Sequence, residues 1–132
     1  MSNLLQWDSR LSVGNETLDA QHQSLLAQCK ALADCLAEPG PEAERRFQEI
    51  FRALMDASRA HFADEEALLA RGGFPEAELE AHRNERDEFS YLADEIITTE
   101  NFDRHELQEF LSLWWSGHIL GSARKQSAFL GA

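Results

Sequence analysis

The chain has little cysteine and no long apolar run, and each shortage argues against a class of protein. Its two cysteines, Cys29 and Cys35, lie six residues apart in one expected helix, where their side chains point in different directions and cannot form a disulfide. A disulfide-stapled secreted domain is therefore not indicated. No stretch of about 18 apolar residues occurs, and the first residues, MSNLLQWDSR, lack the basic start and apolar core of a signal peptide. We therefore expect a cytoplasmic protein with no membrane span.

Basic residues are scarce as well. The chain has 12 Lys and Arg against 24 Asp and Glu, a net charge of −12, which repels nucleic acid and anionic membrane surfaces. We therefore expect neither as a partner. With 43% hydrophobic and 27% charged residues, the composition is that of an ordinary globular protein. A length of 132 residues suits a single domain spanning 1–132.

Proline and glycine are sparse, and where they cluster they mark loops. All three prolines and three of the glycines fall at 39–41 and 72–75, and a polar stretch at 98–101 marks a third loop. Between these loops, apolar residues recur every three or four positions, which is typical of amphipathic helices. Four such helices with short connections predict an all-α, up-down-up-down four-helix bundle.

The ends of these segments carry helix-terminus signals. Pro41 and Pro75 stand at expected first-turn positions, and Asp103 with Glu106 resembles a capping box. We expect residues 1–16 to form an N-terminal arm. Its apolar residues should pack over one end of the bundle; they are Leu4, Leu5, Trp7 and Val13.

The apolar stripes are interrupted by polar residues where a buried seam should be apolar, since burying an unpaired charge is costly. In an up-down-up-down bundle these residues fall within about 6–18 Å of the same end. They are His22, His61, Glu65, His82, Arg86 and His118. Imidazole and carboxylate together are preferred ligands of first-row transition metals. The pattern therefore predicts a metal site in one half of the core, with Asp64 and Glu66 on the solvated face and Cys29 as a small apolar core residue.

Several motifs resemble those of the hemerythrins and bacterial hemerythrin-like proteins, and together they cover nearly the whole chain. The leading arm is matched by Trp7-Asp8 and by Leu11-Ser12-Val13-Gly14. The helix motifs are matched by Asp19-Ala20-Gln21-His22-Gln23-Ser24-Leu25, His61-Phe62-Ala63-Asp64-Glu65-Glu66, His82-Arg83-Asn84-Glu85 with Phe89, and Trp114 with His118-Ile119. This resemblance implies a four-helix bundle with two non-haem irons that binds dioxygen.

Two positions depart from the ligand set that the resemblance implies. Arg86 stands where the family has a histidine, and Ala123 stands where it has a bridging aspartate. The first iron would keep His22, His61 and Glu65, whereas the second would keep only His82 and His118. Two divalent irons, a guanidinium and one carboxylate would leave about +4 in the core, a charge that is prohibitive there. Other carboxylates could substitute for the missing ones; they are Asp19, Glu85 and Asp87.

The ligand pocket implied by the resemblance also differs. Trp115 stands where the family has a leucine that lines the oxygen cavity, and this predicts a smaller or blocked cavity. We assign four residues to this pocket: Phe62, Arg86, Trp114 and Trp115.

Three hypotheses follow. The first is a non-enzymatic sensor or carrier that holds iron through His22, His61, Glu65, His82 and His118 and binds dioxygen or another small diatomic ligand. One iron is favoured, and two or none are alternatives. The second is a metal-free bundle with a Glu65–Arg86 ion pair that acts through an unknown protein partner. The third is a mononuclear iron enzyme, because two histidines and a carboxylate also serve iron oxygenases.

Overall fold

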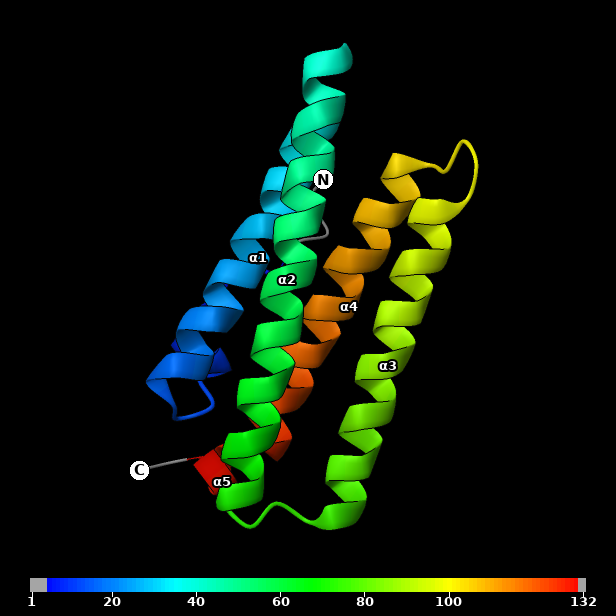
Figure 1. Ribbon diagram of the computed structural model, residues 1–132. Helices are drawn as coiled ribbons and strands as arrows, with labels where there is room; N and C mark the ends of the chain where they lie inside the picture. Colours follow the sequence, from blue (N-terminus) through cyan, green and yellow to red (C-terminus); the bar gives the residue numbers. More distant parts are fainter. Residues whose placement is uncertain (1–4, 131–132) are drawn as a thin grey trace.

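The computed structural model describes residues 5–130, and within that range the regular structure is entirely helical (Figure 1). Four long helices follow one another in antiparallel fashion, which confirms the predicted four-helix bundle. They are α1 (Glu16–Leu36), α2 (Pro41–Arg71), α3 (Glu76–Thr98) and α4 (Arg104–Lys125). A short 3-10 helix, η1 (Ser9–Leu11), precedes them, and a short helix, α5 (Ser127–Leu130), follows them.

The bundle has a simple neighbour relation that places the site. Helix α1 packs against α2 and α4, and α3 packs against the same two helices from the opposite side. The main apolar core lies between the helices and contains large, fully buried side chains such as Phe47, Phe89 and Trp115. Because α1 and α3 start at the end of the bundle where α2 and α4 finish (Figure 1), the polar seam residues meet in that half.

Local chemistry explains where the helices begin. The side chain of Asn15 accepts a hydrogen bond from the backbone N–H of Leu18 at the start of α1, and Asp103 accepts from two backbone N–H groups at the start of α4. Pro41 is the first residue of α2, as predicted. Pro75 instead takes the N-cap position, one residue before α3. Gly40 adopts a φ of +98°, which only glycine readily allows, and this lets the chain turn into α2.

The N-terminal arm packs in two places. Val13 is fully buried at the end of the bundle, in a cluster with Leu18, Phe74 and Leu130. We predicted that Leu5 and Trp7 would also cover one end of the bundle, and they do not. They pack along the side of the bundle with Leu11 against Leu26 of α1 and Ile119 of α4. Leu4 lies outside the described residues.

Asp19 anchors this arm to α1. Its carboxylate accepts hydrogen bonds from the Ser12 hydroxyl at 2.5 Å and from the Val13 backbone N–H at 2.9 Å. The arm is therefore tied to the helix one turn before His22.

The apolar spacing of α4 predicts a buried stripe through Leu107, Leu111, Trp114, His118 and Gly121. The buried face of the helix is rotated slightly from this stripe. The structure buries Trp115, Ile119 and Ser122, whereas Trp114 is only half-buried.

None of the helices described over residues 5–130 is long and apolar enough to cross a membrane. Cys29 and Cys35 are free and buried, and burial raises the pKa of the Cys29 thiol to about 12 against the opposing effect of a hydrogen bond with Ser112.

The short helix α5, which periodicity does not reveal, closes against the end of α2. A Cβ atom added at Gly72 would lie 2.0 Å from the backbone oxygen of Phe129, so this close approach requires glycine. Glycine at position 72 therefore allows α5 to pack on the loop that joins α2 to α3.

Candidate metal centre

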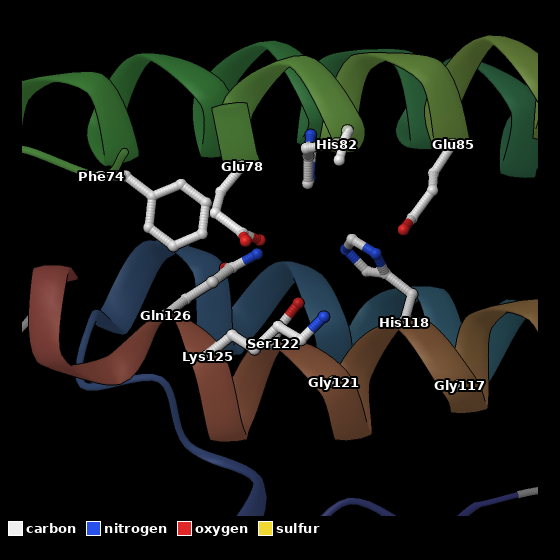
Figure 2. A pocket seen from close by; sticks show the side chains of 11 residues that line it. Phe74, Glu78, His82, Glu85, Gly117, His118, Gly121, Ser122, Lys125 and Gln126 are labelled. Carbon is white, nitrogen blue, oxygen red and sulfur yellow. The ribbon is translucent and has the colours of Figure 1, made fainter. Parts of the chain in front are cut away.

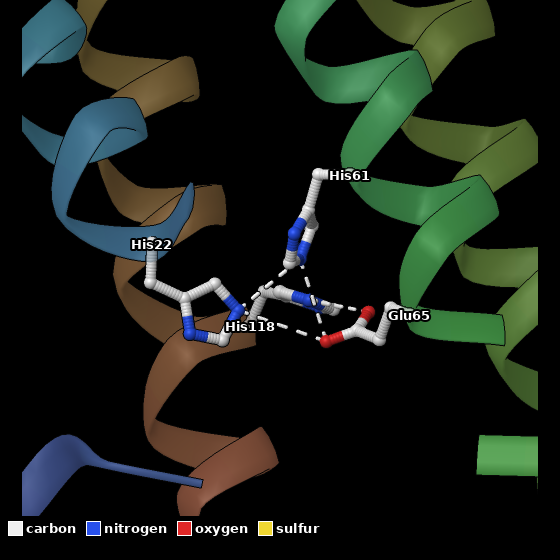
Figure 3. Close-up of side chains that lie close together, drawn as sticks. All are labelled: His22, His61, Glu65 and His118. Atoms are coloured by element: carbon white, nitrogen blue, oxygen red, sulfur yellow. Dashed lines mark hydrogen bonds and ion pairs between the residues drawn. The ribbon is translucent and has the colours of Figure 1, made fainter. Parts of the chain in front are cut away.

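Three helices deliver four buried ligand-type side chains to one point (Figure 3). His22 comes from α1, His61 and Glu65 from adjacent turns of α2, and His118 from α4. One ligand atom of each lies within 4.8 Å of the others. The structure therefore brings together four of the five predicted metal ligands.

Three of these ligand atoms form a compact triangle. The Nε2 atoms of His22 and His61 are 3.1 Å apart. They lie 3.6 Å and 3.4 Å, respectively, from Oε2 of Glu65. At metal–ligand distances of about 2.1 Å, two ligand atoms stand about 3.0 Å apart at a right angle and about 3.4 Å apart at a tetrahedral angle. The triangle therefore has the dimensions of one face of a metal coordination shell.

Unpaired polar atoms in the same place point to a cation. Glu65 Oε2 and His118 Nε2 are buried without a hydrogen-bond partner, although His118 Nε2 lies 3.1 Å from the other carboxylate oxygen. Because Nδ1–H of His61 donates to Gln21, its Nε2 carries a lone pair in the neutral ring and faces His22 Nε2. Leaving Glu65 Oε2 and His118 Nε2 unpaired in a core is unfavourable, and a metal ion would satisfy both. The residues fit a metal.

The electrostatics favour the protonation states that ligands need. Burial lowers the pKa of His61, and this effect outweighs the opposing influence of Glu65, so the ring stays neutral. Burial alone would raise the pKa of Glu65, but its interactions with the imidazoles of His118, His22 and His61 outweigh that effect. The pKa of Glu65 therefore lies well below its usual range. A neutral imidazole and an ionised carboxylate are the metal-binding forms of these groups.

A second layer of residues, which the sequence did not reveal, orients His61. Nδ1–H of His61 donates to Oε1 of Gln21 at 2.8 Å, and the Gln21 amide donates to Asp64 at 2.8 Å. Such partners of a metal-binding histidine hold its ring and select its tautomer. The position of Gln21 immediately before His22 was the available signal, but a glutamine beside a ligand has no specific meaning in sequence.

We therefore expect Gln21→Ala to weaken metal binding although it removes no ligand. Loss of an outer partner of this kind typically lowers metal affinity by about 10- to 100-fold. The measurement is a competition titration of the protein against a chelator of known affinity. Gln23→Ala, on the exposed surface next to His22, is the matched control and should leave affinity unchanged. Equal affinities for the two variants would show that Gln21 does not support His61.

His82, the fifth predicted ligand, lies next to this group of four. Its Nε2–H donates to Oε1 of Glu65 at 2.5 Å and its Nδ1–H donates to Oε2 of Glu66 at 3.0 Å. Burial would lower the pKa of His82, but the hydrogen bonds and charges of these two carboxylates raise it above its usual value. His82 thus holds Glu65 in place in this structure.

Arg86 and Glu66 also correct the sequence predictions. The metal-free hypothesis required an ion pair between Arg86 and Glu65, and Arg86 does not form it. It donates to Oε1 of Glu66 at 2.6 Å and to Asp87 at 3.2 Å. Glu66, predicted to lie on the solvated face, has only 14% of its side chain exposed because it lies between Arg86 and His82. Asp64 is exposed as predicted.

Aromatic side chains form one wall of the centre. Trp115 is fully buried. Its ring stacks on Phe62 with the ring centroids 5.3 Å apart, and it meets His61 edge-on at 5.6 Å. Trp114 stacks on His118 at 5.1 Å. Phe62, Trp114 and Trp115 thus lie beside the centre, whereas Arg86 pairs with Glu66.

The substitute carboxylates considered from the sequence have other places. Asp19 is engaged with the arm, and Asp87 pairs with Arg86 at the surface. Glu85 lines a cavity beside His118. Ala123 is half-buried and lines a separate surface hollow next to Leu11.

Comparisons with known proteins agree with this geometry. The family model described as the hemerythrin HHE cation binding domain matches residues 13–124. Hemerythrin-like proteins of Naegleria gruberi and Naegleria fowleri are each 30% identical over 124 residues, covering 94% of this chain and 92% of the relative. A bacteriohemerythrin of Ralstonia nicotianae is 30% identical over 93 residues, covering 70% of this chain and 61% of the relative. No solved structure matches the chain significantly.

Proposed function

The chain belongs to the hemerythrin family, and from that premise we propose that it is a non-haem iron protein which binds dioxygen or another small diatomic ligand. It acts as a sensor or carrier in the cytoplasm and not as a metabolic enzyme. The observation that carries the proposal is the convergence of four buried ligand atoms within 4.8 Å of one another. The residues that hold the iron are His22, His61, Glu65 and His118.

This ligand set suits a reactive iron site. When bound, iron supplies a redox-active centre. Three imidazoles and a carboxylate fill only four positions of its coordination shell and leave the rest open to small ligands. The protein side chains orient the site and exclude water from it. Glu65 is held by His82, His61 is held by Gln21, and the rings of Phe62 and Trp115 keep bulk solvent from that side.

We further propose that the centre holds one iron. The ion pair between Glu66 and Arg86, extended by His82, engages two of the three positions that the family resemblance assigns to a second iron, Arg86 and His82. The two carboxylates, Glu65 and Glu66, balance the charges of Arg86 and His82. One divalent ion therefore leaves a modest positive charge, whereas a second would add two more charges in a poorly solvated core.

The proposal predicts one iron per chain and one equivalent of small ligand. Metal-free protein is loaded anaerobically with excess Fe²⁺, desalted, assayed for iron and titrated with nitric oxide. We expect one equivalent in each measurement, with no nitric oxide uptake by the metal-free protein. Two irons per chain would refute the charge argument, and no iron would refute the metal centre itself.

A further inference from the structure

A polar cavity of about 200 Å³ lies between α3 and α4, directly beside the metal centre (Figure 2). From α3, Glu78, His82 and Glu85 face it. From the last turns and C-cap of α4, His118, Ser122 and Gln126 face it. The cavity therefore reaches the centre through His118 and through His82, which contacts Glu65.

Exposure shows that this is the side from which solvent reaches the centre. The side chains of His22, His61 and Glu65 are 0% exposed. Those of His118 and His82 are 5% and 7% exposed. The two residues with measurable exposure are the two that line the cavity.

The cavity is graded from charged at its rim to neutral and polar inside. Glu78 and Glu85 are exposed carboxylates, spaced four and three residues from His82 on one face of α3. Deeper in, Ser122 and Gln126 are 3% and 5% exposed, and their Oγ and Oε1 atoms have no hydrogen-bond partner. Oxygen atoms thus line the way from solvent to His118.

Size and chemistry both suit a hydrated cation. Since a water molecule's share of liquid volume is about 30 Å³, the cavity has room for an ion with several of its waters. Carboxylate, hydroxyl and amide oxygens can replace those waters in turn before the imidazoles take over. Lys125 at the rim is a lining group whose fixed positive charge opposes a cation.

We propose that this cavity is the entry path by which a divalent transition-metal ion reaches the centre. Glu78 and Glu85 attract the ion at the rim, the oxygens of Ser122 and Gln126 hold it inside, and His118 receives it. The inference rests on the proposed function, because it requires that the centre binds metal.

The test is the rate of metal uptake. Metal-free protein is mixed with Co²⁺ by stopped flow. Quenching of tryptophan fluorescence reports the arrival of Co²⁺ at the centre. Trp114 and Trp115 lie 5.1 and 5.3 Å from the His118 ring. We expect Glu78→Gln with Glu85→Gln to slow uptake about three- to ten-fold at low ionic strength. Lys125→Gln should speed it about two-fold, and 0.5 M salt should suppress both effects.

A matched control separates local from overall charge. The double variant Glu80→Gln with Glu88→Gln also removes two negative charges from α3. Both positions are exposed, and neither lines the cavity. This variant should take up Co²⁺ at nearly the parent rate. Equal slowing in both double variants would overturn the proposed path, because net charge would then explain the rates.

A steric variant tests the path without changing charge. Gly121 lines the cavity, and a Cβ atom added there meets nothing within 4 Å, so the first side-chain carbon of Gly121→Leu is placed without a clash. We expect slower uptake and an unchanged final Co²⁺ content; an unchanged rate would overturn the proposal. If the unmodified protein binds no Co²⁺ or Fe²⁺ at equilibrium, the proposed function fails, whereas unaffected rates with full binding refute the path alone.

Discussion

Replacing Glu65 with glutamine should remove almost all iron from the protein. Glutamine keeps the volume of the side chain, but the cluster loses the one carboxylate that, among residues 5–130, faces His22, His61 and His118. Since even outer partners of metal ligands contribute about 10- to 100-fold in affinity, loss of this ligand should cost more than about a hundred-fold. The measurement is iron per chain after anaerobic loading and desalting, with far-ultraviolet circular dichroism to verify the fold.

His61→Ala should have the same effect through a different ligand. The control is His105→Ala, because His105 lies in the first turn of α4 with 78% of its side chain exposed. That variant should keep the full iron content. If all three variants hold as much iron as the parent, the ligand assignment is wrong.

Replacing Trp115 with leucine should have the largest effect on stability. The indole is fully buried among Phe62, His61 and His118, and leucine leaves part of that space empty. Large-to-small changes in a core cost about 2–5 kcal/mol. Because the indole N–H is buried without a partner, its removal offsets part of that cost. We expect a loss of about 3 kcal/mol in the free energy of unfolding, measured by urea denaturation of the metal-free protein.

The same substitution should open space beside the centre. Nitric oxide should therefore associate faster with the iron-loaded Trp115→Leu variant than with the parent, as measured by stopped flow. Trp114→Leu is the control, because Trp114 is half-buried and should cost less stability. An unchanged association rate together with reduced stability would show that Trp115 is only a core residue.

Much of the fold was predictable because the apolar spacing of α1, α2 and α3 is regular and because the loops after α1 and α2 carry proline and glycine. Helix α4 was harder. Apolar side chains occur all around it, from Leu111 and Leu113 to Ile119 and Leu120, so spacing alone could not show which face is buried. The prediction therefore chose Trp114 where the structure buries Trp115.

The candidate site was predictable where polar residues interrupt an apolar stripe. His22, His61, Glu65 and His118 stand out for that reason. Glu66 and Gln21 do not, because each lies beside a ligand in sequence and resembles a surface residue. Their roles depend on which side chains neighbouring helices bring to them, as Arg86 and His82 of α3 meet Glu66. Such pairings are set by helix packing and leave no periodic trace in the sequence.

The four converging side chains come from α1, α2 and α4, whereas His82 of α3 contacts the centre through its hydrogen bond to Glu65. A bound ion would thus act as a cross-link among three helices, with His22 and His118 joined across 96 residues of chain. Binding to the folded state alone adds stability that grows with the logarithm of the ligand concentration. It would therefore protect the backbone amides of those three helices from hydrogen exchange most directly. Helix α3, fastened by ion pairs and apolar contacts, would remain the segment that opens first.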